Sequence, residues 1–252
     1  MKKRLVVANW KMYVESPNAA VALARSVRTK LRTLPNVEVA LAPSFVHVPL
    51  VAKALERSLV RVGAQAISGN HESAHTGEIS APMLVAAGAQ FAIVGHSERR
   101  ALGESNEMIR AQILAASDAN LGVILCVGEK ERDHGGEHFS FLKDQLTSAL
   151  TGLSKKALNK LVIAYEPVWA IGKHANDAMK PQEIQETVIF IKKTITALLE
   201  PTLVKKISIL YGGSVEEGNA AQIIKEGGVN GFLVGHASAH IEHFLPILKA
   251  CN

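Results

Sequence analysis

The chain has 252 residues, of which 48% are hydrophobic and 20% charged, and its formal net charge is +5. Its scattered basic residues form no nucleic-acid-binding motif, and its first apolar run, residues 5–8, is too short for a signal-peptide core or a membrane span. Its two cysteines, Cys126 and Cys251, imply no disulfide framework. We therefore expect a cytoplasmic protein that binds neither nucleic acid nor membrane.

Short apolar runs alternate along the chain with longer amphipathic segments. The predicted strands cover Arg4–Asn9, Val37–Ala42, Leu59–Gln65, Phe91–Gly95, Gly122–Val127, Leu161–Glu166, Ile207–Tyr211 and Gly231–Gly235. Most of them are continuously apolar, which is typical of parallel strands buried on both faces. Apolar residues at helical spacing predict helices over Asn18–Leu34, Asn106–Ala119, Phe139–Leu150, Gln182–Leu199 and His240–Ala250.

Eight strand-then-helix units without a linker predict an α/β protein with one domain over residues 1–252. The predicted fold is a (β/α)8 TIM barrel with a parallel eight-stranded barrel. A doubly wound open sheet is the alternative, but it gives no reason to stop at eight units, and no G-x-G-x-x-G follows the first strand. In such barrels the functional residues lie where strands end and the following loops begin.

Polar side chains stand at the ends of three predicted strands. Asn9 and Lys11 follow the first strand, His96 and Glu98 the fourth, and Glu166 ends the sixth. A glutamate, a histidine and a lysine without metal-ligand spacing suit proton transfer beside a carbonyl, with the glutamate as base and the other two stabilising the oxygen. Glu98 either forms an ordinary ion pair or orients Lys11 or His96. We expect no metal and no cofactor.

Two further segments suit a phosphorylated substrate. Glycine-containing turns at Gly212-Gly213-Ser214 and Gly235-His236 follow the last two strands, where barrels usually hold phosphate. An apolar segment follows Glu166 and suits a lid that excludes water, although its tryptophan could equally pack on the barrel rim. The predicted lid comprises Pro167, Val168, Trp169, Ala170, Ile171 and Gly172.

Motifs along the whole chain resemble the triosephosphate isomerase family. They are A-N-W-K-M, G-H-S-E-R-R, C-V-G-E, A-Y-E-P-V-W-A-I-G, Y-G-G-S-V and G-F-L-V-G, in this order. The resemblance implies interconversion of dihydroxyacetone phosphate and D-glyceraldehyde 3-phosphate in glycolysis and gluconeogenesis, without a cofactor. It implies Glu166 as base, His96 as electrophile and Lys11 as electrostatic stabiliser, with Asn9 as a polar contact and Glu98 in support. The implied substrate-binding residues are Asn9, Lys11, Gly172, Ser214, Gly235 and His236.

The chain departs from the family pattern at the lid and at the last loop. Lys173 and His174 stand where the family usually has threonine and glycine, and His236 replaces a second glycine. We expect altered closing rates and an altered phosphate affinity, to which a cationic His236 ring could contribute. Two other functions compete: another phosphate-binding barrel isomerase, and a low-turnover paralogue with a binding role.

One stretch also matches the zinc-protease pattern H-E-x-x-H, at residues 71–75. Zinc proteases need this pattern on a helix, whereas here the flanking residues have loop composition, as do those around His134 and His138. The stretch belongs to the long loop after the third strand. In the family that loop enters a partner subunit, so the resemblance implies a homodimer whose contacts include Thr76, Gly77 and Glu78.

Overall fold

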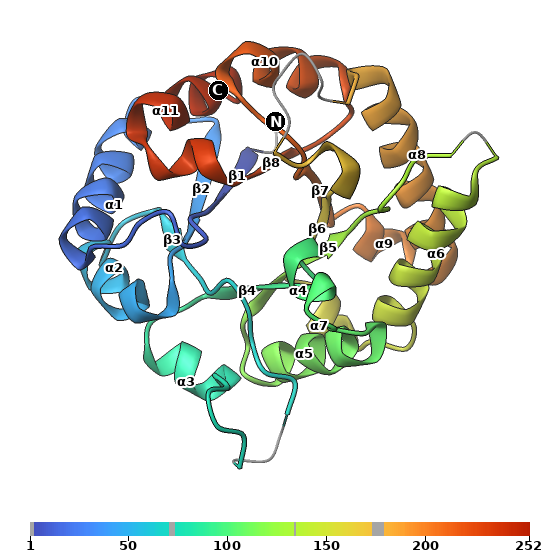
Figure 1. The fold of residues 1–252 in the computed structure, drawn as a ribbon, viewed down its shortest axis with the longest axis horizontal. Helices are drawn as coiled ribbons and strands as arrows, with labels where there is room; N and C mark the ends of the chain where they lie inside the picture. Colours follow the sequence, from blue (N-terminus) through green and yellow to red (C-terminus); the bar gives the residue numbers. More distant parts are fainter. Residues whose placement is uncertain (1–2, 71–73, 134, 173–178) are drawn as a thin grey trace.

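The computed structural model describes residues 3–70, 74–133, 135–172 and 179–252. Within them, eight parallel strands form one sheet in the order β3-β2-β1-β8-β7-β6-β5-β4. The strands are β1 (Arg4–Asn9), β2 (Val37–Ala42), β3 (Arg61–Val62), β4 (Phe91–Val94), β5 (Gly122–Val127), β6 (Leu161–Tyr165), β7 (Ser208–Tyr211) and β8 (Gly231–Val234). In Figure 1 the strands lie around the centre of the molecule, and the helices form a ring outside them.

Backbone hydrogen bonds between β3 and β4 close the sheet into a barrel. Ala64 pairs with Ala92 in a parallel bridge. The Ala64 N–H donates to the Phe91 carbonyl and the Ile93 N–H donates to the Ala64 carbonyl, both at 2.9 Å. The (β/α)8 barrel is therefore confirmed, and the open doubly wound sheet is excluded because no free edge remains between these strands.

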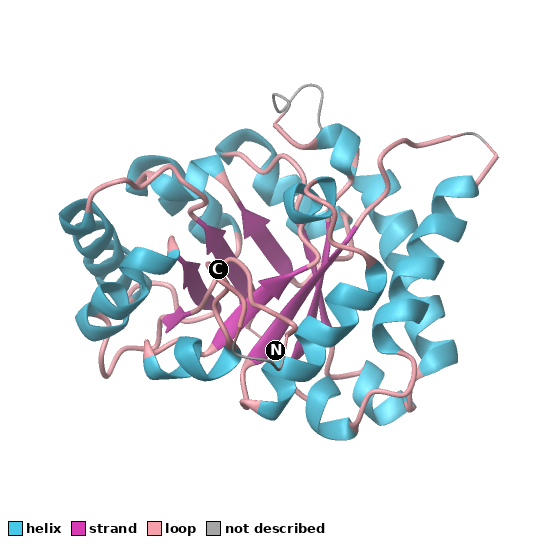
Figure 2. Cartoon of the chain, turned by 60° about the horizontal axis from the view of Figure 1, so that its bottom comes forward, coloured by secondary structure: helices cyan, strands magenta, loops and turns pink. Residues whose placement is uncertain are grey.

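Helices connect the strands and cover the barrel from outside (Figure 2). The helices are α1 (Pro17–Leu31), α2 (Val48–Ala54), α3 (Ala81–Ala86), α4 (Ser97–Ala101), α5 (Asn106–Asp118), α6 (Glu137–Leu150), α7 (Lys155–Leu158), α8 (Pro181–Leu198), α9 (Pro201–Val204), α10 (Glu217–Glu226) and α11 (Ile241–Ala250). Short 3-10 segments occur at η1 (Phe45–His47), η2 (Val168–Ala170) and η4 (His236–Ala239). No helix in the described part of the chain is long and apolar enough to cross a membrane.

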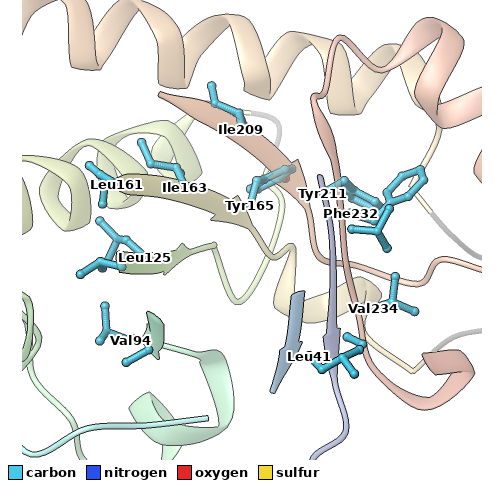
Figure 3. Packing of buried hydrophobic residues seen from close by; sticks show 14 of the residues in the cluster. Leu41, Val94, Leu125, Leu161, Ile163, Tyr165, Ile209, Tyr211, Phe232 and Val234 are labelled. Carbon is cyan, nitrogen blue, oxygen red and sulfur yellow. The ribbon is translucent and has the colours of Figure 1, made fainter. Parts of the chain in front are cut away.

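Both faces of the sheet are buried, which explains why the strands are continuously apolar in sequence. Leu5 and Val7 belong to a small cluster that fills the barrel, whereas Val6 and Ala8 belong to the larger cluster between strands and helices. Figure 3 shows part of that larger cluster, with side chains from several strands packed together. Successive strand residues point to opposite faces, so each strand contributes to both apolar layers.

Five predicted strands are longer than the observed ones, two of them by the single residues Ile207, before β7, and Gly235, after β8. The segment expected over Leu59–Gln65 pairs as a strand only at Arg61–Val62, because Leu59 is 84% exposed and the Gln65 side chain bonds to other loops. Gly95 lies outside β4, since its φ of +69° turns the chain away from the strand direction. Glu166 follows β6 by one residue, although its N–H still donates to the Val127 carbonyl at 2.8 Å.

Candidate active site

A cavity of about 380 Å³ opens at the carboxyl end of the barrel strands. Its walls come from the segments after β1, β4, β6, β7 and β8. The predicted residues that line it are Asn9, Lys11, His96, Glu166, Gly172, Ser214, Gly235 and His236. The structure therefore brings together every predicted catalytic and substrate-binding residue except Glu98, which reaches this group through Lys11 and His96.

Glu166 lies buried at the bottom of this cavity, with only 2% of its surface exposed. Its Oε1 is 3.3 Å from His96 Nε2, and its Oε2 accepts the Ser97 N–H at 3.2 Å. Two glycines leave room for it. A Cβ at Gly128 would lie 1.7 Å from the Glu166 carbonyl oxygen, and one at Gly212 would lie 2.8 Å from the Glu166 side chain. These close approaches fix the position of the carboxylate.

His96 caps the first turn of α4 and presents its other nitrogen to the cavity. Its Nδ1 accepts the Glu98 N–H at 3.2 Å, so this nitrogen carries no proton in the observed arrangement. The ring proton then belongs on Nε2, which faces Glu166. The half-buried Arg100 guanidinium donates to the Gly95 carbonyl at 2.8 Å and holds this turn in place. Burial lowers the pKa of Arg100 from its usual value.

Lys11 carries the positive charge at the cavity. Its Nζ is 2.6 Å from Glu98 Oε1, and its N–H donates to Asn9 Oδ1 at 3.2 Å. Partial burial alone would raise the pKa of Glu98, but the hydrogen bond and charge of Lys11 lower it. The Lys11 backbone has a φ of +44°, a region that non-glycine residues rarely adopt. Such strain persists only where surrounding contacts hold it.

Two residues not predicted from the sequence hold that strained backbone. Gln65 Nε2 donates to the Lys11 carbonyl at 2.9 Å and to the Ala42 carbonyl at 3.0 Å. Ser44 Oγ donates to the same Lys11 carbonyl at 2.9 Å. Both follow neighbouring strands, so the barrel register brings them to Lys11. In the sequence, the two residues are marked only by being polar and lying close to the ends of the second and third strands.

We expect Gln65→Leu to lower kcat/KM for triose phosphate by roughly ten- to a hundredfold, because a small displacement of Lys11 weakens its alignment. The matched control is Gln90→Leu, since Gln90 also contacts β3 but through the Val62 N–H at the opposite end of the barrel. That control should keep kcat/KM within about twofold. If Gln65→Leu also stays within twofold in steady-state assays, Gln65 does not position Lys11.

The predicted lid segment begins with the residue after Glu166, and two residues outside the segment, Glu129 and Ser214, hold it by hydrogen bonds. The Val168 N–H donates to the Glu129 carbonyl, and Trp169 Nε1 donates to Glu129 Oε1, both at 2.9 Å. Ser214 Oγ donates to the Ala170 carbonyl at 3.0 Å. Glu129 is only 1% exposed and also accepts the Tyr165 hydroxyl at 2.9 Å. Lys173 and His174, where the altered hinge was predicted, lie outside the described residues.

His236 occupies the loop after β8 without backbone strain. It begins the 3-10 segment η4, and its φ is not among the positive values found in the described residues. A side chain is therefore tolerated at this position, which the sequence alone left open. Its ring lies 5.1 Å from that of Tyr13, measured between centroids.

Neither cysteine takes part in the site as a nucleophile. Cys126 is fully buried in the barrel interior, and burial together with the nearby Glu166 carboxylate raises its pKa well above the usual thiol range. A thiol held in this protonated form is a weak nucleophile. Cys126 thus packs the barrel beneath Glu166.

The zinc-binding alternative finds no support in the described residues, which contain no group of three or more His, Cys, Asp or Glu that could hold a metal. His71, Glu72 and Ser73 of the H-E-x-x-H pattern lie outside the described residues, as does His134. His138 is described, and the distance between its Nδ1 and Asp133 Oδ2 is 2.9 Å. The bonds from the His138 ring and backbone lower the pKa of Asp133.

Fold and site together define a (β/α)8-barrel enzyme whose mouth gathers a carboxylate, an imidazole and an ammonium group suited to proton transfer. The family model for triosephosphate isomerase matches residues 4–251. The chain therefore belongs to the triosephosphate isomerase family.

Individual relatives agree with this assignment. The triosephosphate isomerase of Flavobacterium johnsoniae is 36% identical over 252 residues, covering 99% of this chain and 100% of that protein. Those of Carboxydothermus hydrogenoformans and Symbiobacterium thermophilum are each 38% identical over 252 residues. They cover 99% of this chain in both cases, and 99% and 97% of the respective relatives. The similarity thus spans the whole chain.

Proposed function

We propose that the protein is a triose-phosphate isomerase that interconverts dihydroxyacetone phosphate and D-glyceraldehyde 3-phosphate, as a step of glycolysis and gluconeogenesis. One observation carries this proposal: Glu166, His96 and Lys11 converge on a single cavity from three different strand ends. The family membership and the names of the relatives support the same reaction.

In the proposed mechanism, Glu166 takes the proton from C1 of dihydroxyacetone phosphate. The released electron pair forms the C1–C2 double bond and moves negative charge onto the C2 oxygen. His96 Nε2–H donates a hydrogen bond to this oxygen, and the Lys11 ammonium stabilises its charge. Protonated Glu166 then returns a proton to C2, and the hydroxyl proton on the C1 oxygen passes to the C2 oxygen. Reactant and product are isomers, so the step needs no oxidant.

The remaining predicted residues take supporting roles. Asn9 accepts the Lys11 backbone N–H and lines the cavity. Glu98 pairs with the Lys11 ammonium, and its backbone N–H donates to His96 Nδ1. We infer that Gly172, Ser214, Gly235 and His236 contact the substrate phosphate through backbone N–H groups. All of them line the same cavity as Glu166, His96 and Lys11.

The segment Pro167 to Gly172 is proposed to act as a lid, a device for which this enzyme family is itself a standard example. Its apolar side chains would keep water from the enediolate, which can lose its phosphate when it is exposed. Glu129 supports this role because it anchors both the backbone of Val168 and the indole of Trp169.

A coupled assay with purified protein tests the proposed function. Glyceraldehyde 3-phosphate should be converted, with the dihydroxyacetone phosphate formed being reduced by an auxiliary dehydrogenase and NADH. Turnover should be competitively inhibited by phosphoglycolate, a mimic of the enediolate. Binding of phosphoglycolate without turnover would instead indicate the paralogue with a binding role, for which no specific observation speaks.

We further propose a homodimer assembled through the loop after β3, in the cytoplasm. The described parts of this loop extend outward beyond the ring of helices (Figure 1). Thr76, Gly77 and Glu78 lie near its tip and are exposed. Large apolar side chains are also exposed in the segments that follow β1 and β2. Met12 is 86% exposed and Val46 is 77% exposed. A partner that docks here would remove these side chains from water.

We expect Val46→Asp to shift the protein from dimer to monomer, because a buried unpaired carboxylate at an interface is costly. Leu59→Asp is the matched control, since Leu59 is 84% exposed but precedes β3 at the other end of the barrel. Sedimentation equilibrium should give a monomer mass for the first variant and a dimer mass for the second. A parent protein that is monomeric with full activity would refute the dimer.

A further inference from the structure

Two aromatic side chains from distant parts of the chain meet at the edge of the cavity. Tyr13 follows β1 and His236 follows β8, and these strands pair directly, so their loops are neighbours. The two rings lie 5.1 Å apart at an interplanar angle of 82°, an edge-to-face contact. Both residues line the cavity that holds Glu166 and Lys11. At this edge, the cavity is therefore lined by two aromatic side chains in addition to backbone groups.

The His236 ring stands at the start of a short row of imidazoles that leads away from the cavity. His240 lies 5.9 Å from His236, and His243 lies 6.0 Å from His240, both between ring centroids. Of these three histidines only His236 lines the cavity. This arrangement offers a matched comparison, because His240 shares the same surface and residue type without touching the site.

Charged groups around His236 favour an anion on its cavity side. Among the described residues, Lys11 comes from the segment after β1, and a Cβ at the neighbouring Gly235 would lie 3.9 Å from its Nζ. Tyr13 comes from the same segment, Glu216 from the segment after β7, and His240 from the end of η4. Within the described part of the chain, two carboxylates line the cavity: Glu166 is buried, and Glu216 is exposed to solvent.

We propose that the His236 side chain is a further substrate-binding and specificity residue, whose imidazole, held edge-on by Tyr13, donates to the dianionic end of the substrate. This inference rests on the proposed function, because it assumes that the phosphate lies at this end of the cavity. Backbone N–H groups are neutral donors at every pH. A protonated imidazole attracts a dianion more strongly than a neutral one, so a contribution from the ring makes anion binding tighter at lower pH.

Direct binding of sulfate tests the proposal without relying on turnover. Sulfate remains a dianion between pH 6 and pH 8, so any change in its affinity belongs to the protein. In NMR titrations the parent protein should bind sulfate about three- to tenfold more tightly at pH 6 than at pH 8. His236→Gln should reduce this ratio to below about twofold, whereas His240→Gln should keep the parent ratio.

Steady-state kinetics add a second measurement, the change in KM relative to kcat, which a purely structural role of His236 would not produce. At pH 6, His236→Gln and His236→Gly should raise KM for glyceraldehyde 3-phosphate by about three- to tenfold while kcat stays within about twofold. Tyr13→Ser should share part of the KM increase, because it removes the ring that packs against His236. His236 is exposed, so these variants should fold as the parent does.

The outcomes separate the inference from the proposed function. If His236→Gln retains the parent's pH ratio for sulfate, the inference is wrong even when the parent isomerises triose phosphates. If the parent binds sulfate with the expected ratio, lost in His236→Gln, but shows no isomerase turnover, then the anion site stands and the proposed reaction fails.

Discussion

Replacing Glu166 with aspartate should lower kcat by roughly 10²- to 10⁴-fold while KM changes only modestly. The backbone of Glu166 is fixed by its bond to Val127 and by its close approach to Gly128. A side chain shorter by one methylene therefore cannot bring its carboxylate to the same point. Proton transfer depends steeply on that placement, whereas the proposed binding of the phosphate by the loops after β7 and β8 does not.

Glu200→Asp is the control for this change. Glu200 pairs with Lys155 on the surface, next to α9, and does not line the cavity. Its shortening should leave kcat within about twofold. Unchanged kcat in Glu166→Asp, measured in the coupled assay, would refute the assignment of Glu166 as the base.

Replacing Lys11 with methionine should lower kcat/KM by roughly 10²- to 10³-fold or more, because the cavity loses its only lining ammonium among the described residues. Lys11 Nζ reaches both the cavity and Glu98 Oε1. The change removes the charge that stabilises the enediolate oxygen and that attracts the phosphate. Both kcat and KM should therefore worsen, unlike the result expected for Glu166→Asp.

The pKa of Glu98 gives this variant an internal check. The hydrogen bond and charge of Lys11 hold that pKa below its usual value, so Lys11→Met should raise it. Lys156→Met serves as the control, since Lys156 lies in α7 away from the cavity. If Lys11→Met folds normally by circular dichroism and keeps full kcat/KM, Lys11 has no electrostatic role in catalysis.

The fold was largely readable from the sequence because both faces of the barrel strands are buried. Continuous apolar runs located every strand, and the repeat of strand and helix indicated the barrel. Strand ends were less predictable. Gly95 and Glu166 leave the ladder through local backbone geometry, and β3 is shortened because Gln65 turns to bond Lys11. Hydrophobicity carries no information about such local hydrogen bonds.

The convergence of the proposed catalytic residues on one cavity was predictable for a related reason: parallel strands bring their carboxyl ends to one face, so a polar residue at a strand end marks a candidate site. The residues that support them were not. Gln65 and Ser44 act on Lys11 only through the register of three adjacent strands. Glu129, from the segment after β5, accepts the indole N–H of Trp169 in the proposed lid. Its position after an apolar strand was visible, but its partner Trp169 depends on the packing of two neighbouring loops.

The most direct test of the account is solvent deuterium incorporation during turnover of dihydroxyacetone phosphate in D₂O, followed by proton NMR. A base that exchanges its proton with solvent should deliver deuterium to C2 of most of the glyceraldehyde 3-phosphate formed. Glu166→Gln should form neither labelled product nor labelled substrate at a comparable rate. Product formation or labelling that persists at the full rate in Glu166→Gln would contradict proton transfer by Glu166.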